Sequence, residues 1–117
     1  ATSMMDINYT TGDTYQAGGM RRPIATITGT SHTATTGNYT ILCNTTSNNI
    51  TINLPAASSN TGRVYNIKKI AAANTLTIDA NASELIDGAT TLAMTTNQQA
   101  RNIVCDGTGW HIISGYL

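Results

Sequence analysis

The acidic side chains are the first residues of this 117-residue chain whose chemistry could serve catalysis. A glycosidase needs two carboxyl groups about 5 to 10 Å apart in a cleft, and Glu84 and Asp87 are close together in the sequence. These two residues flank a tight turn at Asp87-Gly88, however, and acids at such positions commonly bind the backbone of the turn. The chain contains neither the Gly-x-Ser-x-Gly segment of a serine hydrolase nor a phosphate-binding loop. We therefore expect no enzymatic activity and no cofactor.

Two cysteines and two histidines are the residues that could form a disulfide or bind a metal. Cys43 and Cys105 both fall on predicted strands, so they are either joined by a disulfide or buried as free thiols, which behave as small hydrophobic side chains. His32 lies in a Thr/Ser-rich loop, where we expect it to be solvated, and His111 follows Trp110 on the last predicted hairpin. A zinc site needs four ligands at defined spacing. This set does not provide them, so no metal is expected.

Aromatic side chains near the chain end are the candidates for ligand binding. Sugar-binding surfaces use rings that combine an apolar body with a polar edge. Trp110, His111 and Tyr116 would form such a patch if their side chains faced solvent together. The alternative, which we favour for Trp110, is that its ring belongs to the core of the hairpin. Tyr39 and Tyr65 are the other main aromatic residues of this part of the chain.

Composition excludes several classes of partner. Charged residues make up 10% of the chain, and six basic and six acidic side chains give a formal net charge of zero, whereas an average globular protein has roughly 25% charged residues. A chain without excess positive charge is poorly suited to a phosphate backbone. No apolar run approaches the roughly 18 residues of a membrane span. We therefore expect neither nucleic acid nor a membrane as a partner.

The uncharged residues favour an all-β domain. Hydrophobic residues make up 40% of the chain, which is too many for a disordered protein. The polar remainder is rich in Thr, which favours strands, and in Asn and Gly, which favour turns. Ile50, Ile52 and Leu54 alternate with Thr51 and Asn53, as in a strand with one buried face. The predicted strands are 24–30, 39–43, 50–54, 63–70, 75–79, 92–94, 101–105 and 110–114.

The organisation that follows is a single β-domain with a preceding segment. Apolar residues are sparse and aperiodic in residues 1–22, which we interpret as a lead-in or stalk segment that is ordered only when a partner chain holds it. Residues 23–117 would form a compact antiparallel β-sandwich-like domain of short strands, closed by a hairpin around residues 106–109. Within it, residues 50–56 resemble residues 76–82. We attribute this similarity to convergent strand patterning rather than to duplication.

Six segments between residues 36 and 114 carry a recognisable order of strands and turns. They are YTILCN (39–44), ITINLPAA (50–57), GRVYNIKK (62–69), LTID (76–79), IDG (86–88) and DGTGWHII (106–113). Together they resemble the carboxy-terminal β module of tail-fibre, tailspike and baseplate proteins of tailed bacteriophages. The resemblance implies a homotrimeric β-domain at the distal end of a virion appendage. It rests on strand and turn patterns, and it implies no individual ligand residues.

The residues themselves are compatible with a trimer. A domain of this size buries only about 60 to 70% of the surface of its unfolded chain, and the absence of Phe makes the core thin. On the predicted strand 63–70, Val64 and Ile70 lie on one face, and Tyr65 and Ile67 lie on the other. Three copies around an axis would bury such two-faced strands and shield their edges. The alternative is a sandwich with scattered exposed apolar residues, which is normal in monomers.

We therefore expect a structural and host-recognition module of a tail fibre or baseplate appendage, located in the virion tail after assembly in the bacterial cytoplasm. The expected partners are two further copies of the chain, other virion tail proteins and a bacterial cell-surface polysaccharide or lipopolysaccharide, unless the module only caps the fibre. Disulfides are rare in a reducing cytosol, so free thiols are favoured at Cys43 and Cys105. The alternative function is a monomeric secreted carbohydrate-binding or adhesin domain in which these cysteines are bridged.

Overall fold

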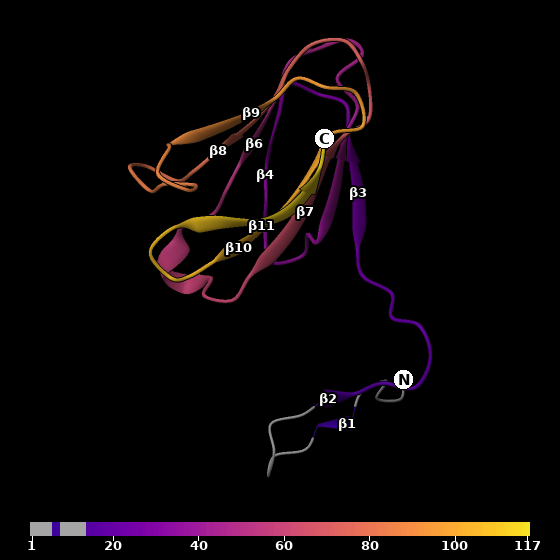
Figure 1. Ribbon diagram of the computed structural model, residues 1–117, viewed down its shortest axis with the longest axis vertical. Helices are drawn as coiled ribbons and strands as arrows, with labels where there is room; N and C mark the ends of the chain where they lie inside the picture. Colours follow the sequence, from indigo (N-terminus) through magenta and orange to yellow (C-terminus); the bar gives the residue numbers. More distant parts are fainter. Residues whose placement is uncertain (1–5, 8–13) are drawn as a thin grey trace.

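Two facing β-sheets form the body of the protein in the computed structural model, which describes residues 6–7 and 14–117 (Figure 1). Among these residues a two-stranded ribbon precedes a five-stranded sheet of order β11-β10-β7-β5-β3 and a four-stranded sheet of order β4-β6-β8-β9. The strands are β1 (Asp6–Ile7), β2 (Thr14–Tyr15), β3 (Ile24–Ile27), β4 (Ser31–Thr33), β5 (Thr40–Cys43), β6 (Ile50–Asn53), β7 (Val64–Lys69), β8 (Leu76–Asp79), β9 (Thr91–Met94), β10 (Ala100–Cys105) and β11 (Trp110–Tyr116).

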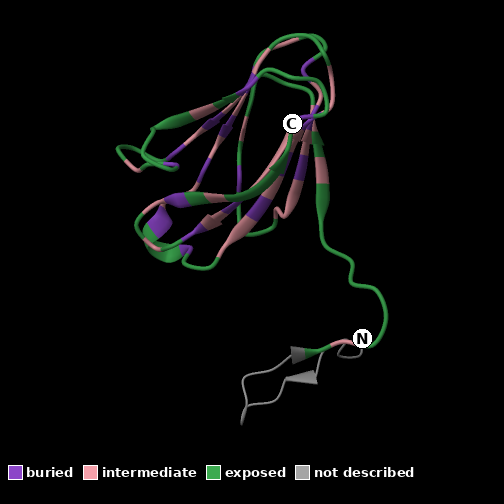
Figure 2. Cartoon of the chain, in the orientation of Figure 1, coloured by how far each residue is buried: buried purple, intermediate pink, exposed green. Residues whose placement is uncertain are grey.

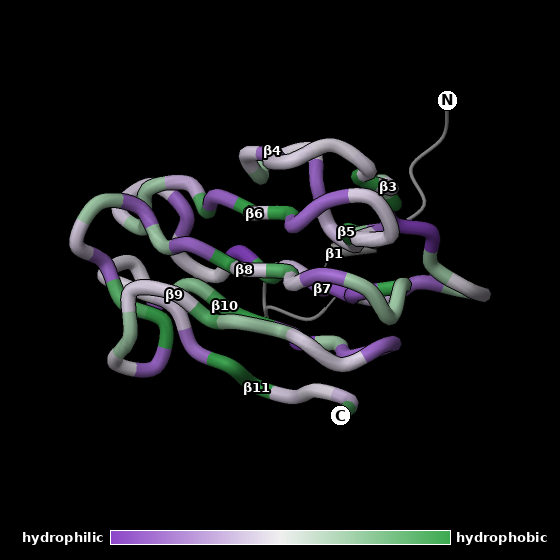
Figure 3. The backbone as a smooth tube through the Cα atoms, turned by 90° about the horizontal axis from the view of Figure 1, so that it is seen from above, coloured by the Kyte–Doolittle hydropathy of each residue, from purple (hydrophilic) through white to green (hydrophobic). Residues whose placement is uncertain are grey.

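The chain changes sheet after every strand from β3 to β7. Neighbours within one sheet are therefore a full turn of the chain apart, and they run in the same direction: β3, β5 and β7 are parallel, and so are β4, β6 and β8. Figure 3 shows the strands of each sheet following one another, from β4 to β9 and from β3 to β11. The body is thus a short flattened coil, and the antiparallel strands β9, β10 and β11 close its far end.

The all-β class is confirmed, but the predicted antiparallel sandwich was wrong in strand direction. Antiparallel pairing within the two sheets is confined to β8–β9, β7–β10 and β10–β11 in the described part of the chain. A parallel sheet that is covered on both faces has nearly continuous apolar strands. Each of these sheets has one open face, so its strands alternate as antiparallel strands do. The sequence pattern therefore could not distinguish the two directions.

The similarity between residues 50–56 and 76–82 has a structural counterpart. β6 and β8 are adjacent parallel strands whose register pairs Ile50 with Leu76 and Ile52 with Ile78. The same spacing separates Thr40 from Asn66, which are partners in the other sheet, so it corresponds to one turn of the coil. Equivalent positions in successive turns have the same neighbours, which explains why similar side chains occupy them.

The other predicted strands are confirmed to within one or two residues, except at the first one. The predicted strand 24–30 is shorter, and the Thr/Ser-rich segment after it forms β4. His32 lies on β4, where it is half-buried with its Nε2 atom 3.1 Å from Oδ1 of Asn38. The expectation of a solvated His32 in a loop was therefore wrong. The connection between β6 and β7 contains a single turn of 3₁₀ helix, η1 (Ala57–Ser59).

The core lies between the two sheets, where Figure 2 shows the buried residues. Isoleucine dominates it, because both sheets present alternate β-branched side chains to the interior. Lys69 is the one charged residue among the buried residues that the structure describes, and it is completely buried. Its Nζ atom donates hydrogen bonds to the carbonyl oxygens of Ala71, Ala72 and Ala73. The ammonium group thereby replaces its hydration shell with the backbone of the loop that follows β7.

The segment before β3 differs from the body. β1 pairs with β2, and residues 17–23 are exposed between this ribbon and the five-stranded sheet (Figure 1). The sheets begin with β3 at Ile24, next to the predicted boundary between residues 22 and 23. Residues 1–5 and 8–13 of the predicted lead-in segment lie outside the described residues.

Candidate functional site

Trp110 belongs to the core and not to a ligand-binding surface. It is only 1% exposed, and its ring stacks on that of Tyr65 with centroids 5.6 Å apart. Trp110 Nε1 has no hydrogen-bond partner among the described residues. The core position that we favoured for Trp110 is therefore confirmed, and its alternative place in a solvent-facing aromatic patch was wrong. Strand alternation is the reason, because the first residue of β11 faces the interior between the sheets.

His111 faces solvent between two carboxylates. Its Nε2 atom lies 2.7 Å from Oδ2 of Asp106, and its Nδ1 atom lies 3.7 Å from Oδ1 of Asp87. The hydrogen bond that His111 donates to Asp106 raises the pKa of His111. The same bond, together with those that Asp106 accepts from the backbone of Thr108 and Gly109, holds the pKa of this carboxyl far below its usual range. The three side chains therefore form an ionic link between two surface loops.

The backbone explains why Asp87 lies beside His111. The loop after β8 pairs with the start of β11, where Trp110 N donates to Leu85 O at 2.9 Å and Asp87 N donates to Trp110 O at 3.1 Å. Asp106, in turn, is held by its own hairpin turn, since its Oδ1 atom accepts hydrogen bonds from the amides of Thr108 and Gly109, both at 2.8 Å. A role in the turn at Asp87-Gly88 was expected for Glu84 and Asp87, and this was wrong: the carboxylate of Asp87 lies 3.4 Å from Ile112 N on β11, and that of Glu84 binds Ala57 N.

Tyr116 is exposed at the opposite end of β11. Lys68 Nζ lies 5.8 Å from the centroid of its ring, a cation–π contact. Five residues separate Tyr116 from His111 along the strand, which corresponds to roughly 15 Å at the rise of a β-strand. The structure therefore does not gather Trp110, His111 and Tyr116 into one patch.

Both cysteines are buried and free. Cys43 pairs with Lys69 at one end of β7, whereas Cys105 N donates to Arg63 O at the other end. The length of β7 separates them by roughly 20 Å, and a disulfide requires Cα atoms closer than about 7 Å. This geometry is incompatible with a bridge between them. Burial raises the pKa of the Cys43 thiol to about 12, so this side chain is uncharged and acts as part of the core.

Glu84 contributes to structure. The two carboxylate oxygens of Glu84 accept hydrogen bonds from Ala57 N, at 3.1 and 3.2 Å, and so cap the first turn of η1. Within residues 6–7 and 14–117, no group of three or more His, Cys, Asp or Glu side chains is arranged to hold a metal ion. No helix in this part of the chain is long and apolar enough to cross a membrane.

The outward-facing side of the five-stranded sheet, which we call the outer B face, is partly apolar. Alternation places Leu42, Val64 and Val104 on it, all half-buried although no element of the described chain packs over them. Between them runs a row of polar side chains, in which Asn102 donates to Asn66 and Asn66 donates to Thr40 at 3.4 Å. The outer B face consists of Ile24, Thr26, Thr40, Leu42, Val64, Asn66, Lys68, Ala100, Asn102 and Val104, together with His111, Ser114 and Tyr116 on the edge strand β11, which pair with Val104, Asn102 and Ala100.

The corresponding side of the four-stranded sheet, the outer C face, is polar. Its register aligns Ser31, Thr51 and Thr77 in one row and Thr33, Asn53 and Asp79 in the next. Among its side chains in β4, β6, β8 and β9, only that of Ala93 is apolar. The two-faced apolar pattern predicted for the strand 63–70 thus corresponds to one particular surface, the outer B face.

Sequence analysis missed one further polar site. Arg22, Tyr39 and Arg63 line a common hollow at the end of the five-stranded sheet. The pair Arg21-Arg22 was visible in the sequence, but nothing in the spacing indicated that Arg63 would lie near it. Comparison with known proteins adds no relative, since neither a family model nor a curated protein matches the chain.

Proposed function

We propose that this chain is a structural and host-recognition module of a bacteriophage tail fibre or baseplate appendage, and that it acts as a homotrimer. The contrast between the outer B face and the outer C face carries the proposal. The outer C face presents hydroxyl and carboxamide groups that hydrogen-bond water, whereas strands β3, β5, β7 and β10 of the outer B face combine aliphatic side chains with a single charge, that of Lys68. The outer C face also carries a single charge, that of Asp79, so the aliphatic side chains are what distinguish the outer B face. The fully buried core of an interface is more apolar than the rest of the surface.

A second copy of the same chain is a suitable occupant of the outer B face. The carboxamides of Asn66 and Asn102 and the hydroxyl of Thr40 each both donate and accept hydrogen bonds. One copy of this face can therefore hydrogen-bond to the polar groups of another copy without placing like charges opposite each other. Closed rotational symmetry lets three copies share such a surface around one axis, and the parallel strands of each chain would then extend along the appendage.

Recognition in this proposal rests on avidity. The resemblance of residues 39–113 to distal appendage modules supports contact with a bacterial surface polysaccharide or lipopolysaccharide. Three equivalent sites on one rigid body engage such a polymer together, so that weak individual binding becomes strong attachment. Other virion tail proteins would hold the opposite end of the trimer.

Light scattering on a dilution series tests the assembly. We expect about three times the chain mass of 12.3 kDa, and we expect Val104→Glu, which places a charge on the outer B face, to give single chains. Thr77→Glu is the matched control, because it places the same charge on a central strand of the outer C face. A wild-type chain that remains single and well folded would refute the trimer.

Cell binding tests the recognition role. Fluorescently labelled protein applied to a panel of bacterial strains should bind at least one of them. Oxidation of the surface sugars with periodate should then remove this binding. A trimer that binds no strain, or that binds oxidised cells equally well, would reduce the proposal to a capping role.

A further inference from the structure

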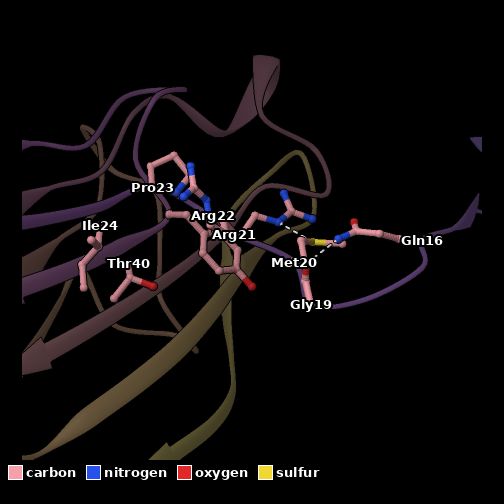
Figure 4. Close-up of a pocket in the computed structure, with 9 residues that line it drawn as sticks. Gln16, Gly19, Met20, Arg21, Arg22, Pro23, Ile24 and Thr40 are labelled. Carbon is pink, nitrogen blue, oxygen red and sulfur yellow. Dashed lines mark hydrogen bonds between the residues drawn. The ribbon is translucent and has the colours of Figure 1, made fainter. Parts of the chain in front are cut away.

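The hollow lined by Arg22, Tyr39 and Arg63 has the features of a binding site. It has a volume of about 320 Å³, and it lies where β5 and β7 begin, beside the segment that leads into β3. It shares Arg22 and Tyr39 with a larger hollow under that segment, shown in Figure 4. Asn38 and Thr36 complete the polar part of its lining.

Arg63 is held in place with its binding groups free. Its Nε atom donates to Oδ1 of Asn60 at 3.0 Å. Asn60 is buried and is itself anchored, because its Nδ2 atom donates to Ala56 O at 2.7 Å and its backbone N donates to Ala57 O at 3.0 Å. The two Nη atoms of Arg63 have no acceptor among the described residues. A guanidinium group fixed in this way offers a planar fork that fits a carboxylate or a phosphate.

Arg22 adds a second cation to the same hollow. Its Nε atom contacts the sulfur of Met20 at 2.9 Å, and its Cζ atom lies 5.2 Å from the centroid of the Tyr39 ring. Figure 4 shows the side chains of Met20 and Arg22 turned toward each other. Within the described residues, carboxylates form ion pairs with His111 alone. Two guanidinium groups thus line one hollow without a described counter-charge, although the whole chain has a formal net charge of zero.

The side-chain amide of Asn38 gives the hollow a further hydrogen-bond donor, which favours a ligand that accepts hydrogen bonds. Oδ1 of Asn38 accepts from Thr35 N at 2.9 Å and lies 3.1 Å from His32 Nε2. These contacts fix the orientation of the carboxamide, and its Nδ2 group remains available as a donor. The hollow is therefore lined by hydrogen-bond donors and positive charge, with the ring of Tyr39 as its aromatic component.

We propose that this hollow binds the anionic group of an acidic saccharide, a carboxylate or a phosphate carried on a sugar. The inference rests on the proposed function and deepens it, because it names the class of glycan and the residues that read it. Arg63 holds the anion through its fork, Arg22 adds charge from the segment before β3, and Asn38 donates to the ligand. A neutral sugar would leave these donors unpaired.

Titration followed by NMR of isotope-labelled protein tests this site. The probes are oligogalacturonate, a phosphorylated mannose oligosaccharide and neutral oligogalactose. We expect at least one acidic probe to shift the resonances of Arg22 and Arg63, and the neutral probe to leave them unchanged. Loss of a charge-assisted hydrogen bond should weaken binding about tenfold in Arg63→Gln and in Arg22→Gln. Arg63→Lys should weaken it similarly, because lysine lacks the fork.

Arg21→Gln is the matched control, since Arg21 carries the same charge one residue away but does not line this hollow. Arg22 precedes the sheets, so its substitution tests the site without altering the core. Equal binding of the neutral probe, or an equal loss of affinity in Arg21→Gln, would overturn the inference. If Arg63→Gln bound cells as strongly as the wild type does, the inference about this hollow would also be overturned, while the proposed function would stand. Failure to bind any cell, with the acidic probes still bound at Arg63, would refute only the proposed function.

Discussion

Replacement of the buried Lys69 by methionine should destabilise the domain strongly. Methionine has nearly the same length as lysine but cannot donate hydrogen bonds. In the native structure Lys69 Nζ donates to the carbonyl oxygens of Ala72 and Ala73 at 3.2 and 3.1 Å, and also to that of Ala71. Ala73 O keeps a second donor, Thr45 Oγ1, at 2.7 Å. The substitution therefore deprives Ala71 and Ala72 of their side-chain donor.

The structure sets the size of this effect. A buried carbonyl that loses its partner costs about 1 to 3 kcal/mol. Ala71 is half-buried and bears this cost, whereas Ala72 is exposed, so water can replace the hydrogen bond that its carbonyl loses. The gain from no longer burying an ammonium group offsets part of the cost. We expect Lys69→Met to lower the free energy of unfolding by about 1 to 3 kcal/mol. For a domain of this size the fall in Tm is roughly 5 to 20 °C.

Urea unfolding at one fixed protein concentration measures the difference, because assembly would otherwise contribute to the stability. Lys68→Met is the matched control: the adjacent side chain points outward and loses only its cation–π contact with Tyr116, so its replacement should change the free energy of unfolding by less than about 1 kcal/mol. If Lys69→Met were as stable as the wild type, the three carbonyl groups would not depend on the ammonium group, and our account of this loop would be wrong.

Two further predictions concern the last hairpin and its neighbouring loop. The stabilisation that comes from the raised pKa of His111 is fully present below the usual value of 6.5, and the stabilisation that comes from the lowered pKa of Asp106 is fully present above the usual value of 3.8. The contact between Asp106 and His111 therefore stabilises the folded protein most between about pH 3.8 and 6.5. Asp106→Asn should return the pKa of His111, followed by NMR, toward 6.5, and an unchanged pKa would contradict this. Gly109→Ala should lower the free energy of unfolding by about 1 to 3 kcal/mol, because the new Cβ would lie 2.8 Å from Leu85 O, whereas Gly29→Ala meets nothing within 4 Å. Equal urea midpoints for these two variants would refute the steric argument.

Much of the fold could be predicted from local patterns. The alternation of Ile50 and Ile52 with Thr51 and Asn53 correctly placed the inward and outward residues of β6, because a strand with one buried face has a period of two. The turn residues at positions 106–109 correctly identified the closing hairpin. The direction of pairing was not predictable in the same way, since it depends on which sheet the chain enters after each strand.

At the candidate site, too, the sequence predicted some features of single residues, whereas others depended on the tertiary structure. His111 and Tyr116 share a strand and are exposed, as the sequence allowed, but the length of β11 separates them. Arg22 and Arg63 are distant in the sequence and meet only because β3, β5 and β7 are neighbours in one sheet. No spacing rule could have joined these two arginines.

The sequence by itself determined that this chain is built from short β-strands with one buried face, because that property depends on side chains two positions apart. Tertiary structure alone decided that the strands are wound into a coil of two sheets, that Lys69 is buried against backbone carbonyls, and that one sheet presents an apolar outer face while the other presents hydroxyl groups. These features depend on contacts between residues a full turn of the coil apart, and at that separation the path of the connecting loops, rather than any local preference, decides which side chains meet.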